Sequence, residues 1–147
     1  MSRRGKMQNK GILDALARSG RWGSPDISGG AIFEIVLEGL PPTVNHLYRT
    51  ARDGTRYKTK AGRRWQQETA SIMRLAWMRP PYEGDVELRL AFQTADRRRW
   101  DIDNRVKAVQ DCLQLGGVLK DDRQVLRLFV GRDFGVVTET RLELLAI

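Results

Sequence analysis

The sequence RRRWDIDNRVKAVQDCLQLGG, residues 97–117, has the pattern of a basic loop followed by a helix, and it is the most informative stretch of the chain. It opens with three arginines, and two aspartates follow, two positions apart. Apolar residues then recur with the spacing of one helix face at Val106, Val109 and Leu113. Two glycines close the stretch, and glycine is the usual residue just past a helix end. The pattern predicts an extended basic loop, a helix over residues 103–115 and a turn after it.

Segments on both sides of this stretch alternate apolar and polar residues, as half-buried strands do. They cover residues 31–39, 84–94, 125–133 and 138–147. Residues 47–59 have strand-like flanks around Asp53-Gly54, a dipeptide typical of hairpin turns. A second helix is predicted over residues 60–78, just before two prolines. Its expected apolar residues are Trp65, Ile72, Leu75 and Ala76. These elements together indicate a compact α+β unit.

Length and composition are those of an ordinary globular protein. The chain has 147 residues and 41% hydrophobic residues, which predicts one domain with a real core. No run approaches the roughly 18 apolar residues of a membrane-spanning helix. The single cysteine, Cys112, and the single histidine, His46, exclude a zinc site built from cysteine and histidine. The lone cysteine also fits a reducing cytoplasm, which is the expected location.

Charge is the most informative bulk property. The chain carries 26 basic and 18 acidic residues, for a net charge of +8, and such an excess favours nucleic acid as a partner. Residues 1–30 contribute +4 and are expected to be a flexible basic extension to a domain over residues 31–147. Residues 49–79 contribute +7, whereas six aspartates gather between 96 and 122. A basic protein with one acidic pocket is the pattern expected of a metal-dependent nuclease.

The geometry of the chain allows these aspartates to meet. Asp101 and Asp103 point to one side only if the backbone is extended up to the helix start. A helix over 104–115 is about 18 Å long at about 1.5 Å per residue. An extended return from Gly117 to Asp122 covers about 16 Å at about 3.3 Å per residue. The second acidic pair, Asp121-Asp122, is therefore expected beside the first. Carboxylates without soft ligands suit Mg²⁺ and also Mn²⁺.

A structural explanation of the same residues stays open. Aspartate at a helix start is commonly a cap. Asp103, Lys107 and Asp111 also follow one another at i, i+4 spacing, which is the spacing of a surface ion-pair ladder. Residue types alone do not separate this alternative from metal catalysis.

The chain resembles the RusA family of Holliday junction resolvases. The segments that carry the resemblance are LPPTVNHLYR (40–49), RRRWDIDNRVKAVQDCL (97–113) and GGVLKDDRQV (116–125). Their order and spacing cover roughly residues 32–146. The resemblance implies a small mixed sheet packed with two main helices. It also implies that Asp101, Asp103 and Asp122 bind the metal and that Lys107 is the essential cation.

One residue departs from the family pattern. Members of the family often have arginine directly before the first aspartate, where this chain has Trp100. Two roles are open for Trp100, stacking on an unpaired base or anchoring the loop from a buried position. The phosphate contact then passes to Arg97, Arg98 and Arg99. Further cations near the hairpin are expected to grip a DNA arm, unless they form only a solvated basic ribbon: Arg49, Arg52, Arg56, Lys58 and Lys60.

The sequence therefore predicts a Mg²⁺-dependent, structure-selective endodeoxyribonuclease of bacterial or phage origin. It would resolve four-way DNA junctions by paired symmetric nicks in recombination and repair, as a homodimer without a small-molecule cofactor. Two-fold assembly is expected because the junction itself has two-fold symmetry. The alternatives are a non-catalytic regulator of the same fold that binds branched DNA, and a metal nuclease that acts on another branched or flapped substrate.

Overall fold

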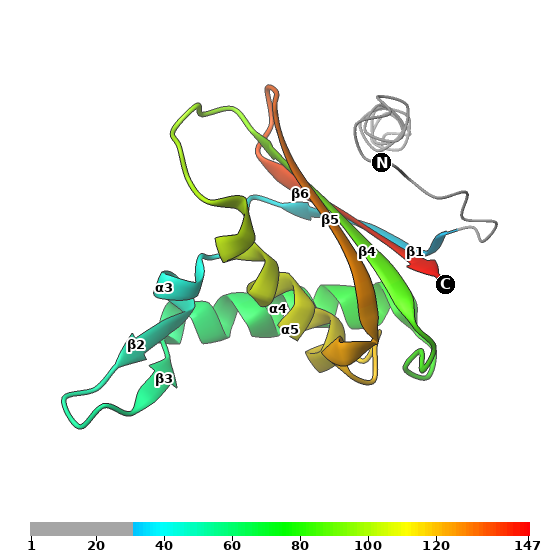
Figure 1. Cartoon of the computed structure of the whole chain (residues 1–147), viewed down its shortest axis with the longest axis horizontal. Helices are drawn as coiled ribbons and strands as arrows, with labels where there is room; N and C mark the ends of the chain where they lie inside the picture. The colour runs from blue at the N-terminus through cyan, green and yellow to red at the C-terminus, as the bar shows by residue number, and fades with distance from the viewer. Residues whose placement is uncertain (1–30) are drawn as a thin grey trace.

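A four-stranded sheet with the order β1-β6-β4-β5 forms the centre of the computed structural model, which describes residues 31–147 (Figure 1). Its strands are β1 (Ala31–Glu38), β4 (Val86–Thr94), β5 (Val125–Phe134) and β6 (Glu139–Ala146). β4 and β5 are parallel, whereas β6 is antiparallel to both β1 and β4. The sheet is therefore mixed, as expected. The predicted basic extension, residues 1–30, lies outside the described residues.

Two helices pack against one face of this sheet (Figure 1). They are α4 (Lys60–Trp77) and α5 (Val106–Leu115). The inward residues of β4 match the predicted alternation, since Leu88, Leu90 and Phe92 are no more than 1% exposed. Phe33 of β1 meets Trp77 of α4 edge-to-face, with ring centroids 5.7 Å apart. The α+β fold with two main helices is confirmed.

The predicted apolar face of α4 is wrong. Ile72 and Leu75 are 52% and 73% exposed, Ala76 is exposed as well, and Trp65 is only half-buried. The buried face consists of Gly62, Gln66, Thr69, Ala70, Met73 and Trp77. Burial of polar side chains on this face is possible because they find partners, as Gln66 does by donating to Asp111 of α5 at 3.3 Å. Hydrophobic spacing alone does not register such pairing.

The helix predicted over residues 103–115 begins later than expected. A 3-10 turn, η1 (Ile102–Arg105), precedes α5, so regular α-helix starts at Val106 and not at residue 103. Asp101 is the cap residue of η1, with extended backbone angles (φ −79°, ψ 123°) and no side-chain capping bond. The Asp101 carboxylate therefore accepts no capping hydrogen bond from the backbone of the turn. At the other end, Gly117 adopts a positive φ of 72°, which glycine permits.

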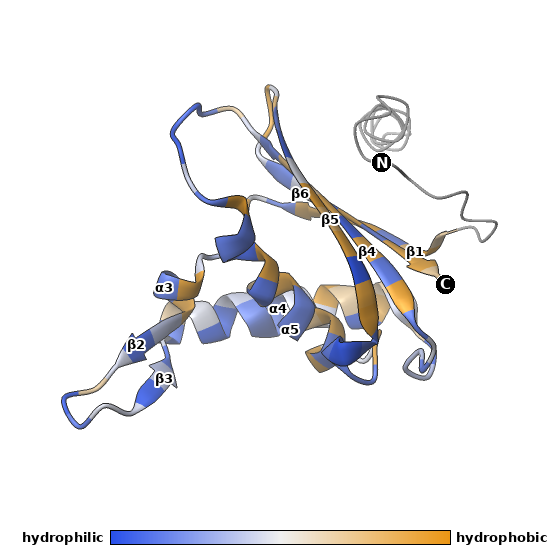
Figure 2. Ribbon diagram, viewed as in Figure 1, coloured by the Kyte–Doolittle hydropathy of each residue, from blue (hydrophilic) through white to orange (hydrophobic). Residues whose placement is uncertain are grey.

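A separate hairpin extends away from the sheet and the two helices (Figure 1). It follows a short unpredicted helix, α3 (Val44–Leu47), and consists of β2 (Tyr48–Thr50) and β3 (Arg56–Lys58). Asp53 fixes the turn by accepting the amide hydrogen of Thr55 at 2.9 Å, and Gly54 has a φ of 88°. Figure 2 shows that the hairpin is mostly hydrophilic, in contrast to the sheet strands. The predicted hairpin is confirmed.

The single cysteine is part of the core. Cys112 is fully buried between the helices, and this burial raises the pKa of its thiol to about 12. The thiol is therefore a packing group and not a reactive one.

Within residues 31–147, none of the helices combines the length and the apolar character needed to cross a membrane.

Candidate active site

Two exposed carboxylates mark the start of α5. Asp101 and Asp103 both belong to the passage through η1, and the amide of Asn104 donates to the backbone oxygen of Asp101 at 3.3 Å. Within residues 31–147, neither carboxylate accepts a hydrogen bond or forms an ion pair. Two like charges held close in sequence and left without partners leave oxygen ligands available. Asp103 lies in the 3-10 turn η1 that leads into α5.

Lys107 lies one turn further along the helix and bridges two other carboxylates. Its Nζ is 2.7 Å from Asp111 Oδ1 and 3.2 Å from Asp122 Oδ2. The bond to Asp111, supported by that to Asp122, raises the pKa of Lys107 above its ordinary value. The side chain is still 46% exposed, so this ammonium group is both held in place and accessible to a ligand.

A second 3-10 turn, η2 (Asp122–Gln124), brings Asp122 to this lysine. Its capping is reciprocal: Asp121 accepts the Arg123 amide at 2.8 Å, and Gln124 accepts the Asp121 amide at 2.7 Å. Gln124 also donates to the backbone oxygens of Tyr82 and Gly84, at 2.7 and 2.8 Å. These bonds fasten η2 beside the segment that leads into β4.

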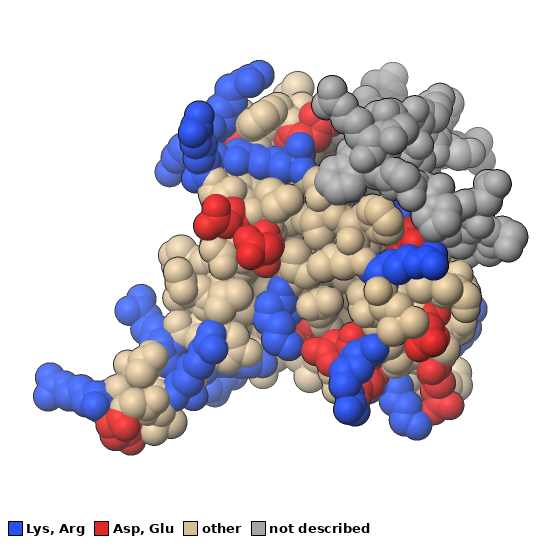
Figure 3. Space-filling view, in the orientation of Figure 1, with Lys and Arg blue, Asp and Glu red and all other residues tan. Residues whose placement is uncertain are grey.

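The structure divides the predicted site into two adjacent parts. Lys107 meets Asp122, but in the described part of the chain no three acidic, histidine or cysteine side chains gather as a metal-binding group. In Figure 3 a basic side chain separates the acidic groups at the start of α5 from those further along it. The return is not fully extended, because the amides of Val118 and Leu119 both donate to the oxygen of Leu113. The three-aspartate ligand set stays a prediction.

The free carboxylates nevertheless fit a hard divalent cation. Mg²⁺ is commonly bound by one or two carboxylates together with waters and substrate phosphates. Asp101 and Asp103 provide such a pair of oxygen donors. The donor set therefore suits the predicted metal.

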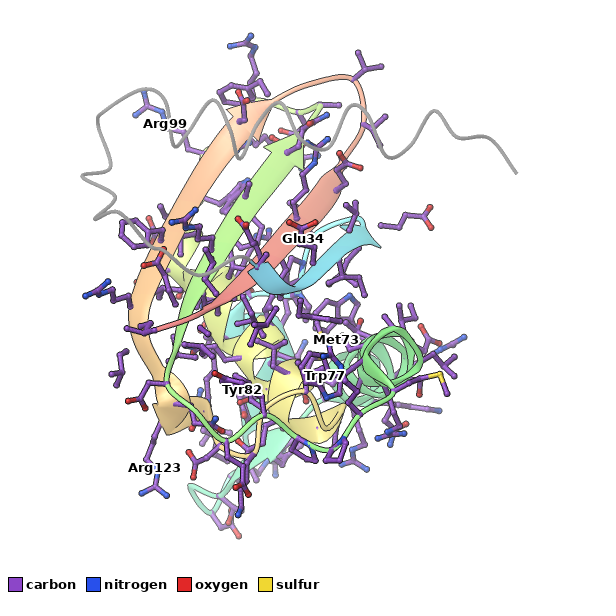
Figure 4. The ribbon with its side chains drawn as sticks, turned by 90° about the vertical axis from the view of Figure 1, so that its right-hand side faces the viewer. Glu34, Met73, Trp77, Tyr82, Arg99 and Arg123 are labelled. Atoms are coloured by element: carbon purple, nitrogen blue, oxygen red, sulfur yellow. The ribbon has the colours of Figure 1, made fainter. Side chains whose placement is uncertain are left out.

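The three arginines before the aspartates differ in their environments. Arg98 forms an ion pair with Asp96 at 2.8 Å, and its amide donates to the same carboxylate. The pKa of Asp96 falls mainly because of that amide bond. The Arg97 guanidinium lies 4.6 Å from the Phe134 ring centre. Arg99 is exposed, points away from the sheet (Figure 4) and forms no ion pair within residues 31–147, so it is the arginine best placed for a phosphate.

Trp100 anchors the loop, as one of the two expected roles requires. It is half-buried and meets the core residue Phe92 edge-to-face, with ring centroids 5.7 Å apart. The guanidinium groups of Arg132 and Arg105 lie 4.4 and 4.6 Å from its ring centre. The sequence pattern did not identify Arg105 or Arg132 as part of the site. It indicated Asp111, the partner of Lys107, only as a member of a possible surface ion-pair ladder. Arg132 stands some thirty positions after Trp100 in an ordinary strand pattern, so no local motif marks it.

The predicted DNA-binding cations of the hairpin are accessible. Arg49, Arg52, Arg56 and Lys60 are exposed, and Lys58 is half-buried. The Arg56 guanidinium lies 4.3 Å from the Tyr48 ring centre, across the two strands. Figure 3 shows basic side chains along this projection with one acidic group at its tip. The hairpin thus presents positive charge beyond the body of the protein.

Comparison with known proteins assigns the family. The family described as endodeoxyribonuclease RusA matches residues 38–144. The crossover junction endodeoxyribonuclease RusA of Escherichia coli strain K12 is 34% identical over 86 residues, which is 58% of this chain and 71% of that protein. The enzyme of the same name from Enterobacteria phage 82 is 33% identical over 86 residues, with the same coverage. The match takes in the basic hairpin, both parts of the acidic site and most of the sheet, and the chain belongs to the RusA family of endodeoxyribonucleases.

Proposed function

We propose that this endodeoxyribonuclease resolves four-way DNA junctions by Mg²⁺-dependent paired nicks. The observation that carries the proposal is the pair of unpartnered carboxylates, Asp101 and Asp103, at the end of an arginine-rich loop. A protein that only bound DNA would gain nothing from free negative charge next to the phosphates it attracts. Relatives named as crossover junction endodeoxyribonucleases occur in bacteria and in a phage, which supports action on DNA in the bacterial cytoplasm.

Each part of the site has a task in phosphodiester hydrolysis. Asp101 and Asp103 would hold the metal, with Asp122 as the third predicted ligand. Bound Mg²⁺ supplies a Lewis acid for the phosphoryl oxygen and lowers the pKa of water. Arg99 binds a phosphate of the scissile strand and thereby orients it. Lys107 presents a permanent positive charge to the phosphoryl group as negative charge accumulates there, and Asp111 keeps that ammonium group in position.

Two symmetric nicks call for two copies of the site. Among residues 31–147, β5 is an edge strand of the sheet, and one side of its backbone pairs with no other strand of that part of the chain. Two of its leucines, Leu126 and Leu128, are 61% and 44% exposed. An open edge with apolar side chains supports association with a second copy, and we expect the mass of a dimer in solution.

The function is tested on a synthetic four-way junction and on linear duplex of the same sequences. We expect symmetric nicks on the junction in Mg²⁺ and none in EDTA, because without the metal the two carboxylates repel the phosphates of the DNA. The linear duplex stays uncut, since shape and phosphate contacts provide the selectivity. Strand-specific end labels show whether the two nicks are paired.

Three results would contradict this proposal. Equal cleavage of linear duplex means a nuclease without structure selectivity. Junction binding without metal-dependent cutting means a branched-DNA-binding regulator. A single chain in solution, at concentrations where both strands are cut, removes the two-fold argument.

The hairpin is expected to bind phosphates of the DNA. Replacing Arg49 and Arg52 by alanine lowers the slope of log affinity against log salt concentration by about 0.9 for each phosphate that the variant no longer neutralises. Measurement of junction affinity in EDTA over a salt series gives this slope. The matched control removes two exposed arginines, Arg74 near the end of α4 and Arg79 just after it. An equal change in both double variants would show that only net charge matters, and that the hairpin has no special role.

A further inference from the structure

Trp100 is the meeting point of three segments of the chain. It follows the loop after β4, it contacts Phe92 within β4, and it lies against one arginine from η1 and one from β5. A guanidinium that lies over an indole face is attracted to the ring. The backbone of Asp101 comes directly after this residue, so whatever fixes the indole also fixes the first carboxylate of the site.

Arg132 ties the loop to the neighbouring strand with four hydrogen bonds. Its Nε and Nη2 donate to Thr94 Oγ1 at 3.1 and 3.0 Å, at the last residue of β4. Its Nη2 also donates to the backbone oxygen of Asp96 at 2.9 Å, and its Nη1 donates to that of Arg98 at 2.6 Å. The guanidinium of Arg132 thus bonds the loop at three points between Thr94 and Arg98. All three acceptors are uncharged oxygens.

Arg105 makes the corresponding connection on the other side of Trp100. Its Nη1 donates to the backbone oxygen of Pro41, which joins η1 to the segment after β1. Burial lowers the pKa of Arg105, and the nearby positive charge of Arg132 lowers it further. Two like charges near one ring repel each other, and their contacts with the indole and with uncharged oxygens offset that cost.

We propose that Arg132 is a positioning residue for Asp101 and Asp103. Together with Trp100 and Arg105 it holds the backbone from Thr94 to Asp101, and it thereby fixes where the two carboxylates lie for the metal that they are proposed to bind. This inference rests on the proposed function of the aspartate pair. It adds a residue from another strand, whose guanidinium bonds Thr94 and the backbone of the arginine-rich loop.

The chemistry of arginine is required at this position. A guanidinium has donors in a rigid planar fork and stacks on aromatic rings, whereas an ammonium group is a compact point charge. Lysine at position 132 keeps the charge but cannot reach Thr94, Asp96 and Arg98 together while it lies on the indole. Mg²⁺ demands near-ideal geometry, and a displacement of about 1 Å at an active site can cost about 100-fold in rate.

The test compares Arg132→Lys with Arg79→Lys. Arg79 is a matched control, because its guanidinium also lies on an indole, 4.0 Å from the ring centre of Trp77, and donates to a backbone oxygen, that of Ile32. At saturating junction, we expect Arg132→Lys to lower the single-turnover cleavage rate about 100-fold and to raise the Mg²⁺ concentration for half-maximal rate. Junction affinity in EDTA stays within about threefold of wild type. Arg79→Lys changes none of these.

Hydrogen exchange gives a readout that does not depend on cleavage. In Arg132→Lys we expect faster exchange over residues 95–101, which include the Arg98 amide bonded to Asp96. Exchange in β4 and β6 stays as in wild type. Calorimetry with Mn²⁺ is expected to show weaker binding to this variant than to Arg79→Lys.

Each result decides the inference. Unchanged loop exchange and unchanged metal affinity in Arg132→Lys would overturn it, and so would equal loss of protection in β4, which indicates a destabilised fold. A wild-type protein that cuts no junction refutes the proposed function instead, and the exchange and Mn²⁺ measurements still test the positioning role.

Discussion

Replacing Asp103 by asparagine is expected to lower junction cleavage by about 1,000-fold while the protein still binds junctions. The carboxylate is exposed and has no partner among the described residues, so its loss removes a metal ligand without breaking a contact of the fold. Metal ions stabilise transition-state charge by several kcal/mol, and about 1.4 kcal/mol corresponds to a factor of ten in rate. Single-turnover cleavage and junction affinity in EDTA measure the two properties separately.

Asp85→Asn is the matched control for this variant. Asp85 is also an exposed carboxylate, and it lies just before β4, away from η1. Its substitution is expected to leave the cleavage rate unchanged. Junction affinity of Asp103→Asn should equal or slightly exceed that of wild type, since one charge that repels phosphate is gone. Cleavage by Asp103→Asn within about tenfold of wild type would remove Asp103 from the ligand set.

Replacing Lys107 by methionine is expected to lower cleavage by about 100- to 1,000-fold, the usual effect of removing one group that stabilises transition-state charge. The variant also leaves Asp111 and Asp122 facing each other without the ammonium group between them. Lys107→Arg restores part of the rate because it restores the charge. Lys120→Met is the control, since Lys120 also forms an exposed ion pair, 2.7 Å from Glu83.

The pH dependence of cleavage gives a second test of Lys107. Its pKa is raised above 10.5 by the bonds to Asp111 and Asp122, which means that folding favours the charged form. The associated stabilisation is fully present below that value and is lost only as the pH rises above it. Lys107 therefore contributes no falling limb to the pH–rate profile between about 6 and 10. A loss of rate near neutral pH that disappears in Lys107→Arg would contradict this assignment.

The sequence predicted the elements of the fold more reliably than their contacts. Alternation in β4 correctly identified Leu88 and Leu90 as core, because a strand inside a sheet has only two faces to choose from. The face of α4 was predicted wrongly, since Gln66 is buried through its bond to Asp111, and such a partner is invisible in a pattern of apolar residues. Tertiary pairing overrode periodicity there.

The candidate site shows the same division. The aspartate pair and the lysine lie within seven residues, but their spacing left a capped helix with an ion-pair ladder equally open. It was the family resemblance that predicted their roles. The partners that position them come from elsewhere in the chain. Arg132 is one of 26 basic residues, and only the parallel pairing of β4 with β5 brings it to the loop. The length of the connecting chain showed that Asp122 can lie beside the helix. Its actual position is fixed by the hydrogen bonds of Gln124 to Tyr82 and Gly84, which the sequence does not reveal.

The β4–α5–β5 connection has a consequence for biosynthesis. A nascent chain has both Asp101 and Asp103 as soon as the loop is made, yet Arg132 emerges only with the following strand. Until β5 docks in parallel beside β4, the four hydrogen bonds that fasten the loop do not exist. Ribosome-bound or truncated chains that end before residue 132 therefore carry the acidic pair without the means to hold it. If Arg132 positions the acidic pair as proposed, that pair acquires its fixed place only when the sheet is complete.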